Sequence, residues 1–554
     1  MSLKRTYSIA QGKLEGYYDS DIVTNDELLQ AYLAKNADAV LRDIVATIQK
    51  DQNDIIRIQP YFNVIVQGVA GSGKTTVAMH RLAYLIFNYS QYMSSDQYAV
   101  IGTNKMFLSY VSGMLPDLGV ESVTQMVMPE LLEAYLKYDH IAAPLDTKTA
   151  LLRSSLAFFE DIKEYMDSLD RDILLHQLSL LDEVILTEKD IEELFLGGLK
   201  KPLLTRAEML NEYLSDKVKR KKPELELLLE KNCDQAVSQF KKGIKGPYQS
   251  TSEIIDNKYI ALKRLYAEAK ALKNIYIKKI NSLTEERVYG NFLKLRGIKK
   301  PKQWDVYDLA ALAYIASRLR PMNSQLRHII IDEAQDFGPM LYMCLTEIYP
   351  SATFTILGDV LQNIGEGVGI TDWDEILGSV FKEHNTRFCV LSKSYRNTVE
   401  IAETANRLSA RSGAARYELV PVVRHGKAVE FSEFPSDKEL EEAAVEEALR
   451  WEKGSLALIC PDTASARRLA AKLPDCGLVC SDDADAHYEG GVTIFDSGSV
   501  KGLEFDRVVV CGAGARDYPD NPRTARLLYV VLTRALHELR VMTVKGSGGL
   551  FDIV

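Results

Sequence analysis

The fold is decided by residues 62–75, which read FNVIVQGVAGSGKT. The first six form a short apolar run typical of a buried parallel strand. The next eight, Gly68 to Thr75, fit the pattern G-x-x-x-x-G-K-[ST], and a helical stretch follows as far as Phe87. Glycines let backbone N–H groups curl around phosphate oxygens, and the first helical turn adds positive potential. This order of strand, loop and helix predicts a triphosphate site in an α/β fold.

We expect this loop to bind ATP together with Mg²⁺. Lys74 would reach the β- and γ-phosphate oxygens, and the Thr75 hydroxyl would coordinate the metal. The remaining predicted nucleotide contacts in the loop and the first helical turn are Gly68, Gly71, Ser72, Gly73 and Thr76.

Two acidic residues follow an apolar strand in the segment HIIIDEAQD at 328–336. Open α/β sheets bind ligands at the carboxyl ends of their strands, where Asp332 and Glu333 fall. We expect Asp332 to hold Mg²⁺ and Glu333 to polarise the water that attacks the γ-phosphate.

Short apolar runs alternate with helical stretches in two groups, which predicts two lobes with doubly wound parallel sheets. The second group begins with the run at Phe388–Leu391. Residues 131–302 interrupt the first group and carry helical patterns without strand signals. The predicted order is a helical segment over 1–45, a first lobe over 46–130 and 303–375 around the inserted helical domain 131–302, and a second lobe over 376–554.

Charge is distributed unevenly along the chain. The net charge is −10, so the chain as a whole is not drawn to phosphate backbones. Residues 199–302, however, contain 25 Lys and Arg against 12 Asp and Glu, which favours a surface that meets a polyanion. No signal-peptide core or membrane-spanning run is present, so a cytoplasmic protein without membrane contact is expected. The seven scattered cysteines favour reduced thiols.

Further motifs occur in an order that resembles superfamily 1 helicases of the UvrD/Rep type. They are GDVLQ at 358–362, LSKSYRN at 391–397, KGLEFD at 501–506 and LLYVVLTRA at 527–535. The resemblance implies two RecA-like lobes that close on ATP, with 3′–5′ movement on single-stranded or partly duplex DNA. It also implies that Gln52 reads adenine, that Tyr395 stacks on it and that Glu504 lies at the ribose. Gln362, Arg396 and Arg534 would contact the γ-phosphate, with both arginines coming from the second lobe. Thr103, Asn104 and Lys105 would lie against the nucleic acid.

Several positions depart from that pattern. Asp496 and Gly498 replace a phosphate-contacting Thr and a nearby His, and an Asp beside a phosphodiester is repulsive. Thr76 stands where many relatives have Arg, and the usual aromatic stretch is reduced to Trp373. Only about 100 residues separate the fourth and fifth motifs, so the large second-lobe insertion of UvrD and Rep is absent.

These departures, with the segments at 43–57, 64–87 and 104–119, resemble the HelD branch, which includes helicase IV-like proteins. Members of that branch can bind RNA polymerase through the first-lobe insertion. From the short N-terminal segment we expect their long coiled coil to be missing or reduced to one helix over Asn25–Ile48. Three functions therefore stay open: a DNA translocase or helicase, an ATPase that remodels or recycles RNA polymerase, and a defence or repair component acting with a partner. The sequence does not indicate an oligomeric state.

Overall fold

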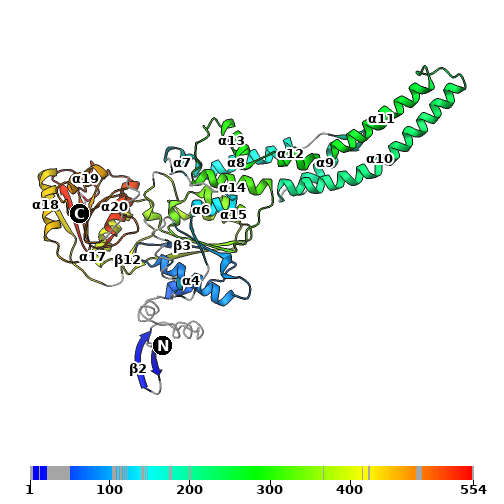
Figure 1. The fold of residues 1–554 in the computed structure, drawn as a ribbon. Coiled ribbons are helices and arrows are strands. Elements are labelled where there is room, and N and C mark those ends of the chain that lie inside the picture. Colours follow the sequence, from blue (N-terminus) through cyan, green and yellow to red (C-terminus); the bar gives the residue numbers. More distant parts are fainter. Residues whose placement is uncertain are drawn as a thin grey trace.

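The computed structural model contains two α/β lobes and a long helical arm (Figure 1). The described residues are 4–10, 13–20, 50–102, 123–138, 147–173, 177–196, 201–365, 367–414, 416–421, 424–481 and 490–551, with single residues 108, 112, 115, 116, 118, 120, 143, 145 and 198. Within this part of the chain, no helix combines the length and apolar character needed to cross a membrane.

The first lobe is built around a sheet of six strands. Its elements are α3 (Lys50–Ile56), β3 (Asn63–Gly68), α4 (Lys74–Tyr89), β4 (Tyr98–Gly102), β5 (Thr124–Val127), α6 (Met128–Leu136), α14 (Val306–Leu319), β8 (His328–Ile331), α15 (Pro339–Ile348), β9 (Thr353–Gly358), α16 (Trp373–Gly378) and β10 (Thr386–Leu391). The strand order is β10-β3-β9-β8-β4-β5, and all neighbours are parallel. Val64 and Val66 pack with α3 and α4, whereas Ile65 packs with α6, α14 and α15. Because both faces are covered, the strands read as nearly continuous apolar runs.

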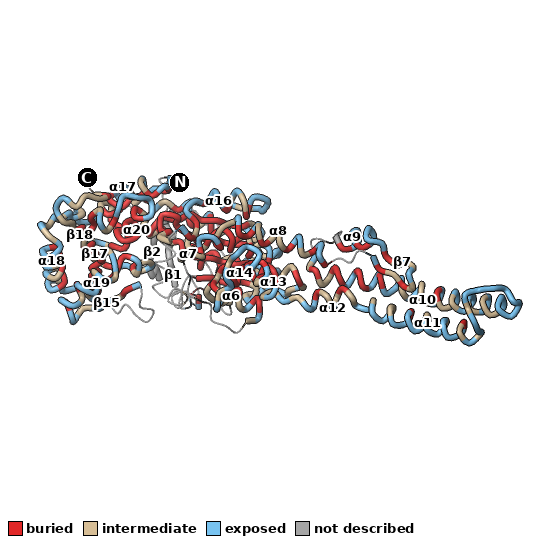
Figure 2. Tube along the Cα trace, turned by 90° about the horizontal axis from the view of Figure 1, so that it is seen from above, coloured by how far each residue is buried: buried red, intermediate tan, exposed pale blue. Residues whose placement is uncertain are grey.

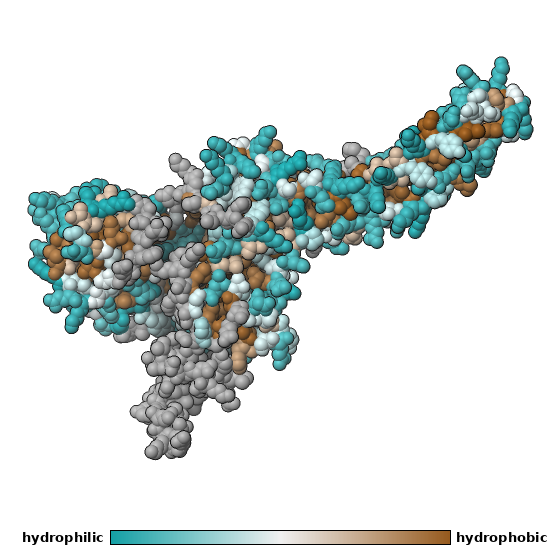
Figure 3. All heavy atoms as spheres, viewed as in Figure 1, coloured by the Kyte–Doolittle hydropathy of each residue, from teal (hydrophilic) through white to brown (hydrophobic). Residues whose placement is uncertain are grey.

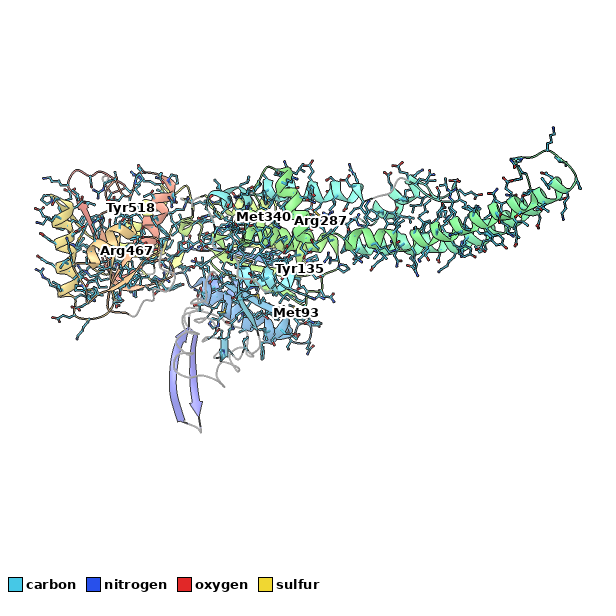
Figure 4. The ribbon with its side chains drawn as sticks, turned by 45° about the horizontal axis from the view of Figure 1, so that its top comes forward. Met93, Tyr135, Arg287, Met340, Arg467 and Tyr518 are labelled. Carbon is cyan, nitrogen blue, oxygen red and sulfur yellow. The ribbon has the colours of Figure 1, made fainter. Side chains whose placement is uncertain are left out.

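The second lobe contains another sheet of six parallel strands. Its elements are β11 (Lys393–Ser394), α17 (Val399–Ser409), β12 (Val420–Pro421), β13 (Glu430–Phe434), α18 (Asp437–Arg450), β14 (Leu456–Cys460), α19 (Thr463–Ala470), β15 (Gly477–Val479), β16 (Val492–Asp496), β17 (Phe505–Cys511), α20 (Pro522–Leu532) and β18 (Ala535–Val544). The sheet order is β13-β18-β17-β14-β16-β15. Helices α18 and α19 pack on one face, and α17 and α20 on the other. Figure 4 shows Arg467 and Tyr518 within this lobe, and Met340 within the first.

The helical domain between α6 and α14 carries the arm. Its elements are α7 (Thr147–Arg153), α8 (Leu156–Asp172), β6 (Leu178–Leu180), β7 (Glu183–Leu186), α9 (Glu188–Leu196), α10 (Leu203–Lys241), α11 (Thr251–Leu272), α12 (Ile275–Asn281) and α13 (Glu285–Leu295). Helices α10 and α11 form a hairpin that projects from the body, and its distal part is largely exposed (Figures 1 and 2). At its root, the Arg206 guanidinium lies 2.7 Å from the Asp170 carboxylate, which also meets Arg318 of α14 at 3.4 Å. Buried charges thus connect the arm to the first lobe.

One strand lies in a different lobe from the one we predicted. Strand β10 pairs with β3 in parallel register, from Thr386 opposite Asn63 to Leu391 opposite Gly68. We had placed these residues in the second lobe, as part of 376–554. A short apolar run predicts a strand but not the strand with which it pairs, so the position of β10 beside β3 could not be predicted from the sequence.

Two hairpins occur where helices were expected. Residues 4–20 form the antiparallel pair β1 (Lys4–Ala10) and β2 (Lys13–Ser20), although a helical segment was predicted over 1–45. Aromatic and β-branched residues in KRTYSIA and KLEGYYDS favour extended backbone. The helix expected over Asn25–Ile48 lies outside the described residues. In the inserted domain, β6 and β7 are joined by Leu181 and Asp182, both at positive φ, as in a tight two-residue turn. Because leucine seldom adopts a positive φ, the sequence did not indicate this turn.

Candidate functional site

The glycine-rich loop connects β3 to α4 at the carboxyl edge of the first sheet. Gly71 and Gly73 have φ values of 71° and 78°, in the left-handed region that favours glycine. A Cβ atom on Gly71 would lie 2.4 Å from the Cβ of Arg396, in the segment after β10. The Tyr395 N–H also donates to the Gly71 carbonyl at 2.9 Å. The loop is therefore held in shape by its glycines and by the neighbouring chain.

The donors in this loop fit the oxygen atoms of a phosphate chain. The Ser72 hydroxyl is buried and has no hydrogen-bond partner within the described part of the chain. The Lys74 ammonium is also buried and donates to the Gly68 carbonyl at 2.9 Å. An ammonium, an unpaired hydroxyl and the start of α4 converge here, which is the donor set that anionic oxygens require.

A hydroxyl and a carboxylate lie in contact beside the loop. Asp332 follows β8 and is fully buried, and its Oδ2 accepts a hydrogen bond from the Thr75 hydroxyl at 2.5 Å. Burial raises the pKa of Asp332, and the neighbouring charge of Glu333 raises it further. Oxygen ligands of this kind suit Mg²⁺, and a cation here would relieve the charge of the buried carboxylate.

Glu333 has an unusual backbone and a fixed side chain. Its φ of 51° lies in the left-handed region, which is uncommon for a non-glycine residue. Its Oε2 accepts a hydrogen bond from Gln335 Nε2 at 2.7 Å, and the Lys501 ammonium lies 3.6 Å away. Burial acts to raise the pKa of Glu333, but the positive charges of Lys501 and Lys74 outweigh burial and lower it. The carboxylate is therefore ionised and able to accept a proton from water.

A narrow cleft runs from the loop towards the segment after β10. It is lined by Asp51, Gln52, Ser72, Leu391, Ser392, Lys393 and Tyr395. Gln52 is nearly buried on α3, and its Nε2 donates to the Ser72 carbonyl at 2.8 Å. Two of the predicted base-binding residues, Gln52 and Tyr395, thus lie on one cleft. Thr76 is partly exposed on the first turn of α4.

The second lobe contributes a buried arginine. Arg534 follows α20, and its Nη2 donates to Gln362 Oε1 of the first lobe at 3.0 Å. Its Nε and Nη1 donate to the carbonyls of Val530 and Leu503 in its own lobe, at 3.0 and 3.3 Å. Burial and the charge of Arg396 lower the pKa of Arg534 to about 10, so it remains a cation at neutral pH.

Arg396 lies in the segment between β11 and α17, both of which belong to the second lobe. It lies five residues beyond the end of β10, against Gly71 of the phosphate loop. Its guanidinium forms an ion pair with Glu504 of the second lobe. The predicted ribose contact Glu504 therefore meets the site through Arg396.

The sequence reasoning missed a buried chain of amides and carboxylates. Gln67, the penultimate residue of β3, donates from Nε2 to Asp359 Oδ1 at 2.8 Å. Asp359 Oδ2 accepts from Gln362 Nε2 at 2.8 Å, and Gln362 accepts from Arg534. This series of hydrogen bonds joins β3, the strand before the glycine-rich loop, to the second lobe. A polar residue at the end of an apolar strand, such as Gln67, was the available signal.

Of the residues discussed as neighbours of the nucleic acid, the structure describes Asp496 but not the three predicted contacts. Thr103, Asn104 and Lys105 lie outside the described residues. Asp496 is turned inward: it is buried, and its carboxylate accepts hydrogen bonds from the Thr463 hydroxyl and from both the backbone and the hydroxyl of Ser481. Burial acts to raise the pKa of Asp496, but the hydrogen bonds from Ser481 and Thr463 outweigh burial and lower it, so the carboxylate stays ionised inside the lobe. Its expected repulsion of a phosphodiester stays a prediction.

Trp373 is also occupied internally. It is fully buried, and its indole N–H donates to Gln67 Oε1 at 2.6 Å. The aromatic residue that remained from the expected stacking stretch thus supports the site and offers no face to a base.

Ion pairs reduce the basic character of the arm. Within the cluster at 217–222, Lys221 pairs with Glu183 at 2.7 Å, Lys219 with Asp216 at 3.2 Å and Lys222 with Glu226 at 3.7 Å. The predicted polyanion surface on 199–302 stays a prediction.

One family model matches the C-terminal part of the chain. Residues 491–542 match the family model described as UvrD-like helicase C-terminal domain. This match covers β16, β17 and α20, and it also contains Lys501 and Glu504 on the turn between β16 and β17 and Arg534 just after α20. Among solved structures, the chain is similar to the C-terminal domain of a possible DNA helicase from Lactobacillus plantarum WCFS1, at 21% identity, 29% coverage of this chain, 93% coverage of that chain and a TM-score of 0.23. No curated protein matches the chain in sequence.

Proposed function

We propose that the chain is an ATP-dependent DNA translocase or helicase of superfamily 1, in which two RecA-like lobes couple ATP hydrolysis to 3′–5′ movement along single-stranded DNA. One observation carries the proposal. The phosphate loop with its Thr75–Asp332 contact meets the Gln362–Arg534 hydrogen bond, so groups from both lobes converge on one place. The UvrD-like helicase match over residues 491–542 supports the same class.

The residues divide the chemistry among them. Lys74 and the Ser72 hydroxyl bind phosphate oxygens, while Gln52 and Tyr395 hold the base. Thr75 and Asp332 would hold Mg²⁺, which when bound neutralises charge on the β- and γ-phosphate oxygens. Glu333 orients the attacking water and accepts its proton.

Hydrolysis acts on the contact between the lobes. Arg534 is fastened to its own lobe and points to Gln362, so it reaches the γ-phosphate only when the lobes are closed. Loss of the γ-phosphate removes an anion from between Lys74 and Arg534, and the remaining contacts hold the lobes together less strongly. Repeated closing and opening on a bound strand produces stepping.

The test is ATP turnover measured with no nucleic acid, with single-stranded DNA and with single-stranded RNA. We expect strong stimulation by DNA, and an affinity for DNA that falls steeply as salt rises, because phosphate contacts release counterions. Turnover that is unchanged by DNA at low salt would count against translocation while leaving the ATPase assignment intact.

A second function is favoured by the surface of the arm. Large apolar side chains are exposed on its distal half, and apolar residues are visible along it in Figure 3. They are Leu227, Leu228, Phe240, Ile244, Ile255, Tyr259, Ile260 and Tyr266. Large exposed apolar patches mark sites where proteins interact with other proteins or with membranes. They support the alternative of a HelD-like ATPase that binds and remodels or recycles RNA polymerase.

Substitutions on the arm distinguish the two functions. Tyr259→Ser with Ile260→Ser should abolish retention on core RNA polymerase if the arm is its binding surface, and leave DNA-stimulated ATPase unchanged. Leu449→Ser is the matched control, because Leu449 is 75% exposed but lies on α18 of the second lobe. A wild-type chain that is not retained on core polymerase would remove this alternative.

A further inference from the structure

Lys501 crosses from the second lobe to the acidic residues of the first. It lies on the turn between β16 and β17, and its ammonium is 2.5 Å from Asp336 Oδ1 and 3.6 Å from Glu333 Oε2. Its side chain is 18% exposed, so most of it is buried where the two lobes meet. Its charge lowers the pKa of Glu333, but none of the roles assigned above uses its position between the lobes.

Glu333 needs support from its surroundings. Its left-handed backbone is less stable for a residue with a side chain than the ordinary helical or extended conformations. Gln335 fixes one carboxylate oxygen, Oε2, and Gln335 is itself held by the Asp359 N–H, which donates to Gln335 Oε1 at 2.9 Å. Lys501 approaches that same oxygen, which leaves Oε1 as the atom that can face water.

The two acidic residues share the lysine unequally. Asp336 is in direct contact with the ammonium, whereas Glu333 lies beyond hydrogen-bond distance from it. Asp336 therefore anchors Lys501 close enough to attract Glu333 but not to bind it tightly. Because the lysine belongs to the other lobe, this arrangement exists only when the lobes are together.

We propose that Lys501, anchored by Asp336, is a positioning residue that holds Glu333 in its hydrolytic orientation when the second lobe closes. The inference rests on the proposed ATPase function, in which Glu333 activates water. Opening the lobes withdraws the lysine and releases Glu333, so hydrolysis is restricted to the closed state at two points, Arg534 and Lys501.

The experiment compares Lys501→Gln, Lys501→Arg and wild-type full-length chains with DNA present. At saturating ATP, Lys501→Gln should lower kcat by about 100-fold, the typical effect of misplacing a reacting group by about 1 Å. The dissociation constant for a fluorescent ATP analogue should change less than about threefold. Lys501→Arg keeps the charge and should recover most of the lost rate.

A second comparison shows whether Lys501 acts through Glu333. In a Glu333→Gln background, adding Lys501→Gln should cause no further loss of the residual rate, because there is no carboxylate left to position. Lys427→Gln is the matched control. Lys427 forms an ion pair with Glu538 at 2.6 Å within the second lobe and not across the two lobes, so its loss should leave kcat unchanged. Thermal unfolding confirms that each variant is folded.

Three results would overturn the inference. They are a Lys501→Gln rate within twofold of wild type, a loss of ATP binding that matches the loss of rate, and a further large drop in the Glu333→Gln background. Failure of the ATPase function, on which the inference rests, looks different, because wild-type protein would then show no ATP hydrolysis at all.

Discussion

Replacing Arg534 by alanine tests whether the second lobe completes the site. Two of its hydrogen bonds, to the carbonyls of Val530 and Leu503, fasten the guanidinium to its own lobe, and the third reaches Gln362 at 3.0 Å. The charge is therefore already in place when the lobes close, and little ordering remains to be done. We expect the variant to lose ATP turnover and to keep nucleotide binding, because Lys74 and Gln52 are untouched.

The size of the effect follows from these contacts. An arginine that stabilises a transferring phosphoryl group contributes about 10³–10⁵ in kcat, which corresponds to about 4–7 kcal/mol of activation free energy. The substitution also removes the donors to the Val530 and Leu503 carbonyls. Val530 keeps a hydrogen bond from the Thr533 hydroxyl at 3.0 Å, whereas the loss at Leu503 costs about 1–3 kcal/mol of the free energy of unfolding. The variant should therefore be both slower and less stable.

The assay is phosphate release at saturating ATP with single-stranded DNA, together with the dissociation constant of a fluorescent ATP analogue. Arg534→Lys is the matched control, since it keeps a positive charge but loses the planar guanidinium, and its rate should fall between the other two. Thermal unfolding separates lost chemistry from lost structure. A folded Arg534→Ala protein that hydrolyses ATP at the wild-type rate would show that this arginine is not part of the site.

Three other predictions follow from the described geometry. Glu333→Gln should bind ATP and cleave it only at a small residual rate, so filter-retained nucleotide stays mostly as triphosphate; phosphate release at the wild-type rate would contradict the role of Glu333. Lys74→Ala should abolish hydrolysis and weaken ATP binding, as measured by the same fluorescent analogue, and unchanged affinity would contradict its phosphate contact. Burial lowers the pKa of His80 from 6.5 to about 4, so the unfolded chain takes up a proton before the folded one and stability is lost as pH falls from about 6.5 to 4. At pH 5 the free energy of unfolding is lower by about 2 kcal/mol. The free energy of urea unfolding of His80→Asn should therefore depend less on pH than that of wild type, and an equal pH dependence would show that His80 is not the group responsible.

The local parts of the site could be predicted because their signals are local. The strand, loop and helix at Asn63–Tyr89 follow one another in the chain, and so do β8 and Asp332. Glycine spacing and apolar runs encode such units directly. The strand β10 was also predicted, but its place beside β3 was not, since pairing depends on contacts between distant segments.

The contacts that join the lobes could not be predicted from the sequence. Lys501 and Asp336 are 165 positions apart, and nothing in either segment specifies the other. The inward orientation of Asp496 depends in the same way on Ser481, which follows β15, and on Thr463 at the start of α19. Resemblance suggested which residues matter, whereas the partners of each side chain required the three-dimensional arrangement.

The length of the arm has a mechanical consequence. Helix α10 has 39 residues, and at 1.5 Å per residue it extends for about 58 Å. A rotation of about 5° at its base carries the far end through about 5 Å, close to one turn of an α-helix. Small fluctuations in the angle at the base produce larger displacements of the far end, so the stiffness of the base determines how precisely the far end is positioned. The carboxylate of Asp170, shared between Arg206 and Arg318, braces that pivot.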